Sequence, residues 1–172
     1  MSGLVDDLAR AEIGRTFNFY RDGAGAALRR RRLRAYLAAR SDAPVLLVGE
    51  APGYRGARVS GIPFTSERQL SGSGPAEATA TIVRRVLAEL CVEDEVLCWN
   101  VVPTHPGTES SNRPPTRAEV EGGLRYLERL ARGRRTIAVG RVAQSVLGGE
   151  HVRHPSRGGA VAFRVGLARL LA

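Results

Sequence analysis

Residues 45–53 read VLLVGEAPG, and this segment decides the fold. The four apolar residues 45–48 predict a buried strand, and the Gly and Pro residues from Gly49 to Gly53 predict where it ends. The carboxylate of Glu50 stands where the strand stops. Ligands of open α/β sheets bind at the carboxyl ends of the strands. By itself the segment favours an ordinary strand-to-loop turn with a solvated Glu50, and a functional site of an α/β sheet at Glu50 is the alternative.

Strand-like and helix-like segments alternate along the chain. Apolar runs predict strands, and apolar residues at helical spacing predict helices. We predict strands at 45–50, 95–100, 134–140 and 150–153, helices at 22–39, 76–90, 117–131, 141–147 and 159–171, and long loops at 51–75 and 103–115. Thr116 and Glu119 have the spacing of a capping box for the helix 117–131.

This alternation predicts an α/β class fold with three layers. We expect a doubly wound parallel sheet of about four strands with helices on both faces. One domain covers residues 1–172 in this interpretation, and residues 1–44 form a helical segment packed on it. The first twenty residues are mixed and show no clear periodicity.

The composition limits the possible partners. The chain has 172 residues, 43% of them hydrophobic, and no apolar run of membrane-spanning length. We expect a cytoplasmic, monomeric protein without membrane contact. The net charge is +9 and all 26 basic residues are arginine, which favours DNA as a partner, with a merely solubilising surface as the alternative. Because no lysine is present, a Schiff base on a lysine side chain is excluded.

The run Arg29–Arg32, continued by Arg34, falls on the predicted helix 22–39. Successive side chains on a helix point in different directions, so the run must wrap around it. We expect it to form a solvated surface with some attraction for DNA.

The only two cysteines are Cys91 and Cys98. Two thiols by themselves hold neither an iron–sulfur cluster nor a closed zinc site. Both have apolar neighbours, so we expect both to be buried and reduced.

Three of the predicted strands each end at one polar residue. These residues are Glu50, Asn100 and His154. The ends of parallel strands meet at one edge of the sheet, so these side chains are expected to converge there. His105, in the loop after Asn100, is expected on the surface, with contact to DNA or attack on a sugar as the alternative.

Three segments in this order, 49–53, 100–103 and 154–156, together resemble the uracil-DNA glycosylase superfamily. They read GEAPG, NVVP and HPS. Gly61-Ile62-Pro63-Phe64 stands where that family has its base-stacking aromatic residue, and the segments 112–116 and 139–143 are also similar to the family. The resemblance covers about 45–165. The first turn resembles family four, the iron–sulfur branch, whereas the loop 56–65 is closer in length to family five.

The chain departs from both of these branches because the four ligand cysteines are absent, so the resemblance implies neither an iron–sulfur cluster nor any other cofactor or metal. The chain also lacks the inserted histidine loop of the branch that traps uracil DNA covalently. The implied function is base excision repair by a monofunctional DNA glycosylase. Such an enzyme flips uracil out of DNA, hydrolyses its N-glycosidic bond and leaves an abasic site.

The resemblance also implies roles for single residues. Phe64 would stack on uracil, Asn100 would read its O4 and N3–H edge, and His154 would donate to O2 as charge develops there. The best-known branch activates water with an Asp where this chain has Ala51, so Glu50 is the available carboxylate. The implied residues are catalytic Glu50 and His154, uracil-binding Gly49, Ala51, Phe64 and Asn100, and DNA-binding Pro52, Gly53, Arg55, Arg58, Arg113, Ser156 and Arg157.

Three other functions remain open at this point. Ala51 and the scarcity of carboxylates also fit a binder of uracil-containing DNA that does not turn over. The loop similar to family five fits a glycosylase for other deaminated bases, such as hypoxanthine or xanthine. A small nucleotide-binding domain is disfavoured, because the first turn has neither a G-x-G-x-x-G nor a Walker pattern.

Overall fold

The computed structural model describes residues 2–172. Its sheet contains β1 (Val45–Gly49), β2 (Val96–Asn100), β3 (Arg135–Val139) and β4 (His151–Val152). The strands are parallel and lie in the order β2-β1-β3-β4. The chain passes from β1 to β2 on one side and then to β3 on the other, so the strand order reverses at β1. Such a switch point is where doubly wound sheets bind ligands.

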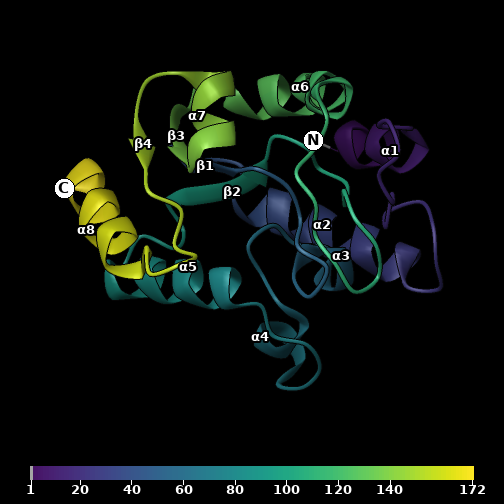
Figure 1. Ribbon diagram of the computed structural model, residues 1–172, viewed down its shortest axis with the longest axis horizontal. Coiled ribbons are helices and arrows are strands. Elements are labelled where there is room, and N and C mark those ends of the chain that lie inside the picture. Colours follow the sequence, from purple (N-terminus) through teal and green to yellow (C-terminus); the bar gives the residue numbers. More distant parts are fainter. Residues whose placement is uncertain (1) are drawn as a thin grey trace.

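Helices cover both faces of this sheet, which confirms the three-layer α/β fold. Figure 1 shows α6 and α7 on one side of the sheet, α5 and α2 on the other, and α8 beside β4. The central strand β1 and the edge strand β2 are buried at every position. The longer helices are α1 (Ser2–Arg10), α2 (Ala26–Ala39), α5 (Ala78–Glu89), α6 (Arg117–Ala131), α7 (Arg141–Leu147) and α8 (Ala160–Leu171).

The start of α6 confirms the predicted capping box. Thr116 Oγ1 accepts a hydrogen bond from the Glu119 backbone N at 3.3 Å, and Glu119 Oε2 accepts one from the Thr116 backbone N at 2.8 Å. Two donors that the helix itself leaves unpaired are thereby satisfied, and the helix begins at the predicted residue.

Two regions contain helices whose bounds were not predicted from the sequence. Residues 2–10 form α1, whose Leu4, Val5 and Leu8 are buried. The loop 51–75 contains α3 (Ala57–Ser60) and α4 (Glu67–Ser71), which end at Gly61 and Gly72, both in the left-handed conformation. The helices α3 and α4 are too short to establish a periodic pattern, and their glycine caps look like loop residues in the sequence.

The helix predicted from Asp22 begins four residues later, at Ala26. Instead of capping it, the Asp22 carboxylate accepts hydrogen bonds from Arg21 at 3.0 and 3.1 Å. Gly23 adopts a φ of 83°, and turns occupy the intervening residues.

In the arginine run on α2, Arg31 is exposed as expected of a solvated surface, whereas the other four arginines have protein partners. Arg29 Nε donates to the carbonyl oxygen of Phe19 at 2.6 Å, and Arg30 Nη1 donates to that of Tyr20 at 2.5 Å. Arg32 forms a two-pronged ion pair with Glu67 at 2.7 and 2.9 Å. Arg34 pairs with Asp6. These side chains hold neighbouring segments onto α2, a role that depends on partners far away in the sequence.

The two cysteines differ in environment. Cys98 is buried in β2 as predicted, but Cys91, just after α5, is exposed, and both are free thiols. Within residues 2–172, no helix is long and apolar enough to cross a membrane.

Candidate active site

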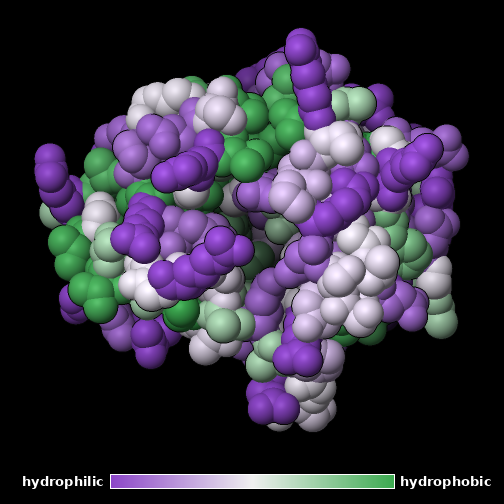
Figure 2. Space-filling model, in the orientation of Figure 1, coloured by the Kyte–Doolittle hydropathy of each residue, from purple (hydrophilic) through white to green (hydrophobic). Residues whose placement is uncertain are grey.

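A cavity of about 450 Å³ opens at the carboxyl ends of the strands. Figure 2 shows a hollow near the centre of this face, bordered by hydrophilic side chains. Most of the predicted site residues line it, drawn from the end of β2 and from the loops after β1, β2 and β4: Glu50, Ala51, Pro52, Gly53, Phe64, Asn100, Arg113, His154, Ser156 and Arg157. Gly49, Arg55 and Arg58 are not among the lining residues.

Gly49 makes room for two of the lining side chains. It is the last residue of β1 and pairs in register with Asn100, the last residue of β2. A Cβ atom at this position would lie 2.4 Å from Phe64 Cζ and 2.9 Å from Asn100 Oδ1, both closer than atoms can approach. The missing side chain therefore lets the Phe64 ring and the Asn100 amide meet at the strand ends.

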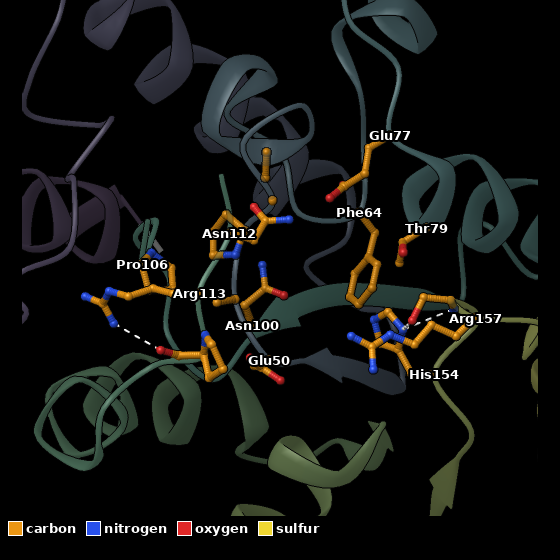
Figure 3. Close-up of a pocket in the computed structure, with 16 residues that line it drawn as sticks. Glu50, Phe64, Glu77, Thr79, Asn100, Pro106, Asn112, Arg113, His154 and Arg157 are labelled. Carbon is orange, nitrogen blue, oxygen red and sulfur yellow. Dashed lines mark hydrogen bonds between the residues drawn. The ribbon is translucent and has the colours of Figure 1, made fainter. Parts of the chain in front are cut away.

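The Asn100 side chain lies in the middle of the lining residues, with Phe64 to one side and Arg113 to the other (Figure 3). Asn100 is only 4% exposed. In the part of the chain that the structure describes, no protein group forms a hydrogen bond with its side-chain amide. The amide therefore keeps both a donor and an acceptor for a bound molecule.

The His154 ring is held as a neutral donor. Its Nδ1 accepts a hydrogen bond from the backbone N of Ser156 at 3.2 Å and lies 2.8 Å from the Ser156 hydroxyl. Because a backbone N–H only donates, Nδ1 carries no proton and the proton of the neutral ring is on Nε2. Burial also lowers the pKa of His154, which favours this neutral form.

The carboxylate of Glu50 lies at the switch point of the sheet, with no ion-pair partner among residues 2–172. Burial raises its pKa above the ordinary value of 4.5. Its backbone carbonyl accepts a hydrogen bond from Val102 N at 3.0 Å, which ties the turn to the segment after β2. The side chain is placed to accept a proton or to face a developing positive charge.

A second carboxylate in the cavity, that of Glu77, was missed by the sequence interpretation. Glu77 precedes α5 and lies against the loop after β1, where Cβ atoms on Gly53 and Gly56 would lie 1.7 and 2.0 Å from its oxygens. Burial raises its pKa as well. It belongs to no motif, and only the contact between two distant loops reveals it.

The predicted DNA-binding arginines differ in their surroundings. Arg113 lines the cavity but forms a two-pronged ion pair with the buried Glu119 at 2.6 and 2.7 Å. Arg58 pairs with Glu109 at 3.2 Å, lies over the Phe17 ring, and is 14% exposed. Arg55 lies over the ring of Tyr54. Arg157 lines the cavity and is exposed.

His105 is buried, which contradicts the expected surface position. Its Nδ1 lies 2.7 Å from the Pro52 carbonyl oxygen, and its Nε2 lies 2.9 Å from that of Thr108. The ring therefore joins the turn after β1 to the loop after β2 and is not available to DNA. In the same loop, Asn112 Oδ1 accepts from Tyr54 N at 2.9 Å, and Asn112 also lines the cavity.

The residues do not fit the iron–sulfur cluster of family four. Such a cluster takes four cysteine ligands, whereas this chain has two, one buried and one exposed. Among residues 2–172, no three His, Cys, Asp or Glu side chains gather as a metal site would require.

Comparison with known proteins agrees with this geometry. Residues 37–167 match the family model described as "Uracil DNA glycosylase superfamily". The structure is similar to the crystal structure of wild-type Pedobacter heparinus SMUG2, with a TM-score of 0.72 and 12% sequence identity over 99% of this chain and 96% of the other. A search of curated protein sequences found no match.

Fold, site and family match together define the class of this protein as a DNA glycosylase, a hydrolase that acts on damaged bases in DNA. More particularly, the chain belongs to the uracil DNA glycosylase superfamily, since the matched residues span most of its length.

Proposed function

We propose that this protein removes uracil from DNA by hydrolysing the N-glycosidic bond of deoxyuridine, leaving an abasic site. The observation that carries the proposal is the free Asn100 amide, buried beside Phe64 in a cavity that His154 also lines. Asn100 would donate to uracil O4 and accept from N3–H. Cytosine presents the reverse pattern, and such mismatches in a buried site discriminate by about 10⁴-fold.

The remaining side chains supply the chemistry of bond cleavage. A flipped base would stack on Phe64. Nε2–H of His154 would donate to uracil O2 as negative charge develops on the leaving base, which is an interaction directed at the transition state. Glu50 would orient the attacking water or stabilise the positive charge on the sugar. Ala51, which follows it, adds no carboxylate.

The reaction would be hydrolysis alone. No lysine side chain is present to form a Schiff base with the sugar, so no strand cleavage by a lyase step is proposed. No cofactor is needed for the roles given to these residues. The exposed Arg157 at the cavity rim would contact phosphate, which contributes to affinity without reading sequence.

A second candidate substrate is a deaminated purine, such as hypoxanthine or xanthine. Beyond the set needed for uracil, the cavity is also lined by the polar side chains of Glu77, Thr79 and Asn112. Two of these would serve the additional ring of a purine, through the amide donors of Asn112 and the carboxyl group of Glu77.

The test is base release from a panel of oligonucleotides that carry uracil, hypoxanthine or xanthine, followed by alkali to cleave abasic sites. We expect strand scission of uracil DNA only after alkali. No scission with enzyme in large excess would refute glycosylase activity on uracil, and retention of uracil DNA without free base would indicate a binder. Faster release of hypoxanthine than of uracil would favour the second candidate.

A further inference from the structure

The backbone at Phe64 has a strained conformation. Phe64 adopts a φ of 50°, in the left-handed region that side chains other than glycine rarely occupy. Its ring is 7% exposed and lies against the end of β1. A strained conformation of this kind persists only where the surrounding contacts impose it.

The side chain of Arg84 on α5 provides such contacts. Arg84 Nε donates to the carbonyl oxygen of Phe64 at 3.2 Å and lies 3.0 Å from Thr65 Oγ1. Arg84 Nη2 donates to the carbonyl oxygen of Pro63 at 3.1 Å and to Thr65 Oγ1 at 2.7 Å. One guanidinium group thus engages three consecutive residues centred on Phe64. A rigid planar fork of donors suits this geometry, and the single ammonium of a lysine does not.

The guanidinium group also contacts an aromatic side chain of α2. It lies 5.5 Å from the centre of the Tyr36 ring, within the range of a cation–π contact. The Tyr36 hydroxyl accepts a hydrogen bond from Cys98 N of β2 at 2.7 Å. Arg84 is therefore fixed between α5, α2 and the sheet, and it transmits that rigidity to the segment 63–65.

We propose that Arg84 is a positioning residue that holds residues 63–65 so that Phe64 presents its ring to the flipped base. This inference rests on the proposed function. Arg84 touches neither the base nor the reacting atoms in this role, and it is not among the residues that line the cavity. It acts by fixing the aromatic surface before DNA arrives, so that binding does not have to order it.

The experiment compares Arg84→Met and Arg84→Lys with Arg85→Met. Arg85 is the next residue on α5, is exposed, and pairs only with Glu89 at 3.6 Å, so it controls for loss of one positive charge from the helix. Two quantities are measured: the single-turnover rate of uracil release at saturating enzyme, and amide hydrogen exchange in residues 62–66. Melting temperature and affinity for undamaged DNA are recorded for each variant.

We expect Arg84→Met to slow uracil release by roughly 10- to 100-fold, the scale of a misplaced binding group. Exchange in residues 62–66 should accelerate, and affinity for undamaged DNA should change less than twofold. Arg84→Lys should restore part of the rate, and Arg85→Met should match the wild type in both quantities.

Arg84→Met with the rate and exchange of Arg85→Met would overturn the inference, as would a slow rate with unchanged exchange. If Arg84→Met does not fold, Arg84→Lys decides in the same way: wild-type values for both quantities overturn the inference, and a slower rate with faster exchange supports it. If the wild type releases no uracil, the proposed function fails, and the role in stacking fails with it. Exchange in the variants then still shows whether Arg84 holds the segment.

Discussion

Asn100→Asp replaces one amide nitrogen in the cavity by an oxygen of nearly the same size. The residue is 4% exposed, so the new carboxylate would be largely removed from bulk solvent. Where the amide would donate to uracil O4 in the proposed complex, the carboxylate would oppose O4 with a second acceptor. An unsatisfied buried polar group costs about 1–3 kcal/mol, and more when it is charged. We therefore expect kcat/KM for uracil DNA to fall by about 10²- to 10⁴-fold, equivalent to ~3–5 kcal/mol.

The assay compares alkali-revealed uracil release with binding to the same duplex without uracil, measured by fluorescence anisotropy. Asn112→Asp is the matched control. It adds the same negative charge at the exposed rim of the cavity and keeps the oxygen that accepts from Tyr54 N. Both variants should bind undamaged DNA with similar affinity, and only Asn100→Asp should lose uracil release to this extent. Equal losses of catalysis and of plain DNA binding in Asn100→Asp would remove Asn100 from base recognition.

Three further variants examine the site and its support. Glu50→Gln should slow uracil release, measured in single turnover from pH 4 to 8, and should abolish an acid limb that lies above pH 4.5, because burial raises the pKa of Glu50. Glu119→Gln should lose about 1–3 kcal/mol of unfolding free energy in urea at pH 7, because it breaks the ion pair between the buried Glu119 and the partly exposed Arg113. Gly49→Ala should lower both kcat/KM and stability, the latter by about 1–3 kcal/mol, because its Cβ would overlap Phe64.

Each of these variants has an outcome that contradicts its reasoning. For Glu50→Gln it is a rate profile identical to that of the wild type. For Glu119 the wild type itself should show a pH dependence of stability. The Arg113 side chain lowers the pKa of Glu119 to about 2. The stabilisation by the pair is therefore present above pH 4.5 and is lost as the pH falls toward 2. The unfolding free energies of the wild type and of Glu119→Gln are compared between pH 4.5 and pH 2. If both proteins lose the same amount over this range, the pair does not contribute to stability. For Gly49→Ala, unchanged kinetics would mean that the ring of Phe64 moves freely.

The fold was largely predictable because its signals are local. The apolar runs of β1 and β2 mark buried strands, and the Thr116–Glu119 pair marks the first residue of α6. That Glu50, Asn100 and His154 line one cavity was predictable for a related reason, since a parallel sheet brings the ends of its strands together whatever lies between them. Glu77 and His105 were not predictable. Their positions depend on contacts between loops that are distant in the sequence, and no periodic pattern records such contacts.

The arginines show why net charge is a poor measure of a DNA-binding surface in this chain. Much of the basic excess is used inside the fold: Arg29 and Arg30 bind backbone carbonyls beside α2, Arg84 binds those around Phe64, and Arg134 binds those of Ala43, Leu130 and Ser41. A guanidinium group bound to carbonyls remains charged, but it has fewer of its five N–H donors left for a close contact with phosphate. The number of phosphates neutralised on binding should therefore be well below the count of arginines, and the salt dependence of DNA affinity reports that number directly.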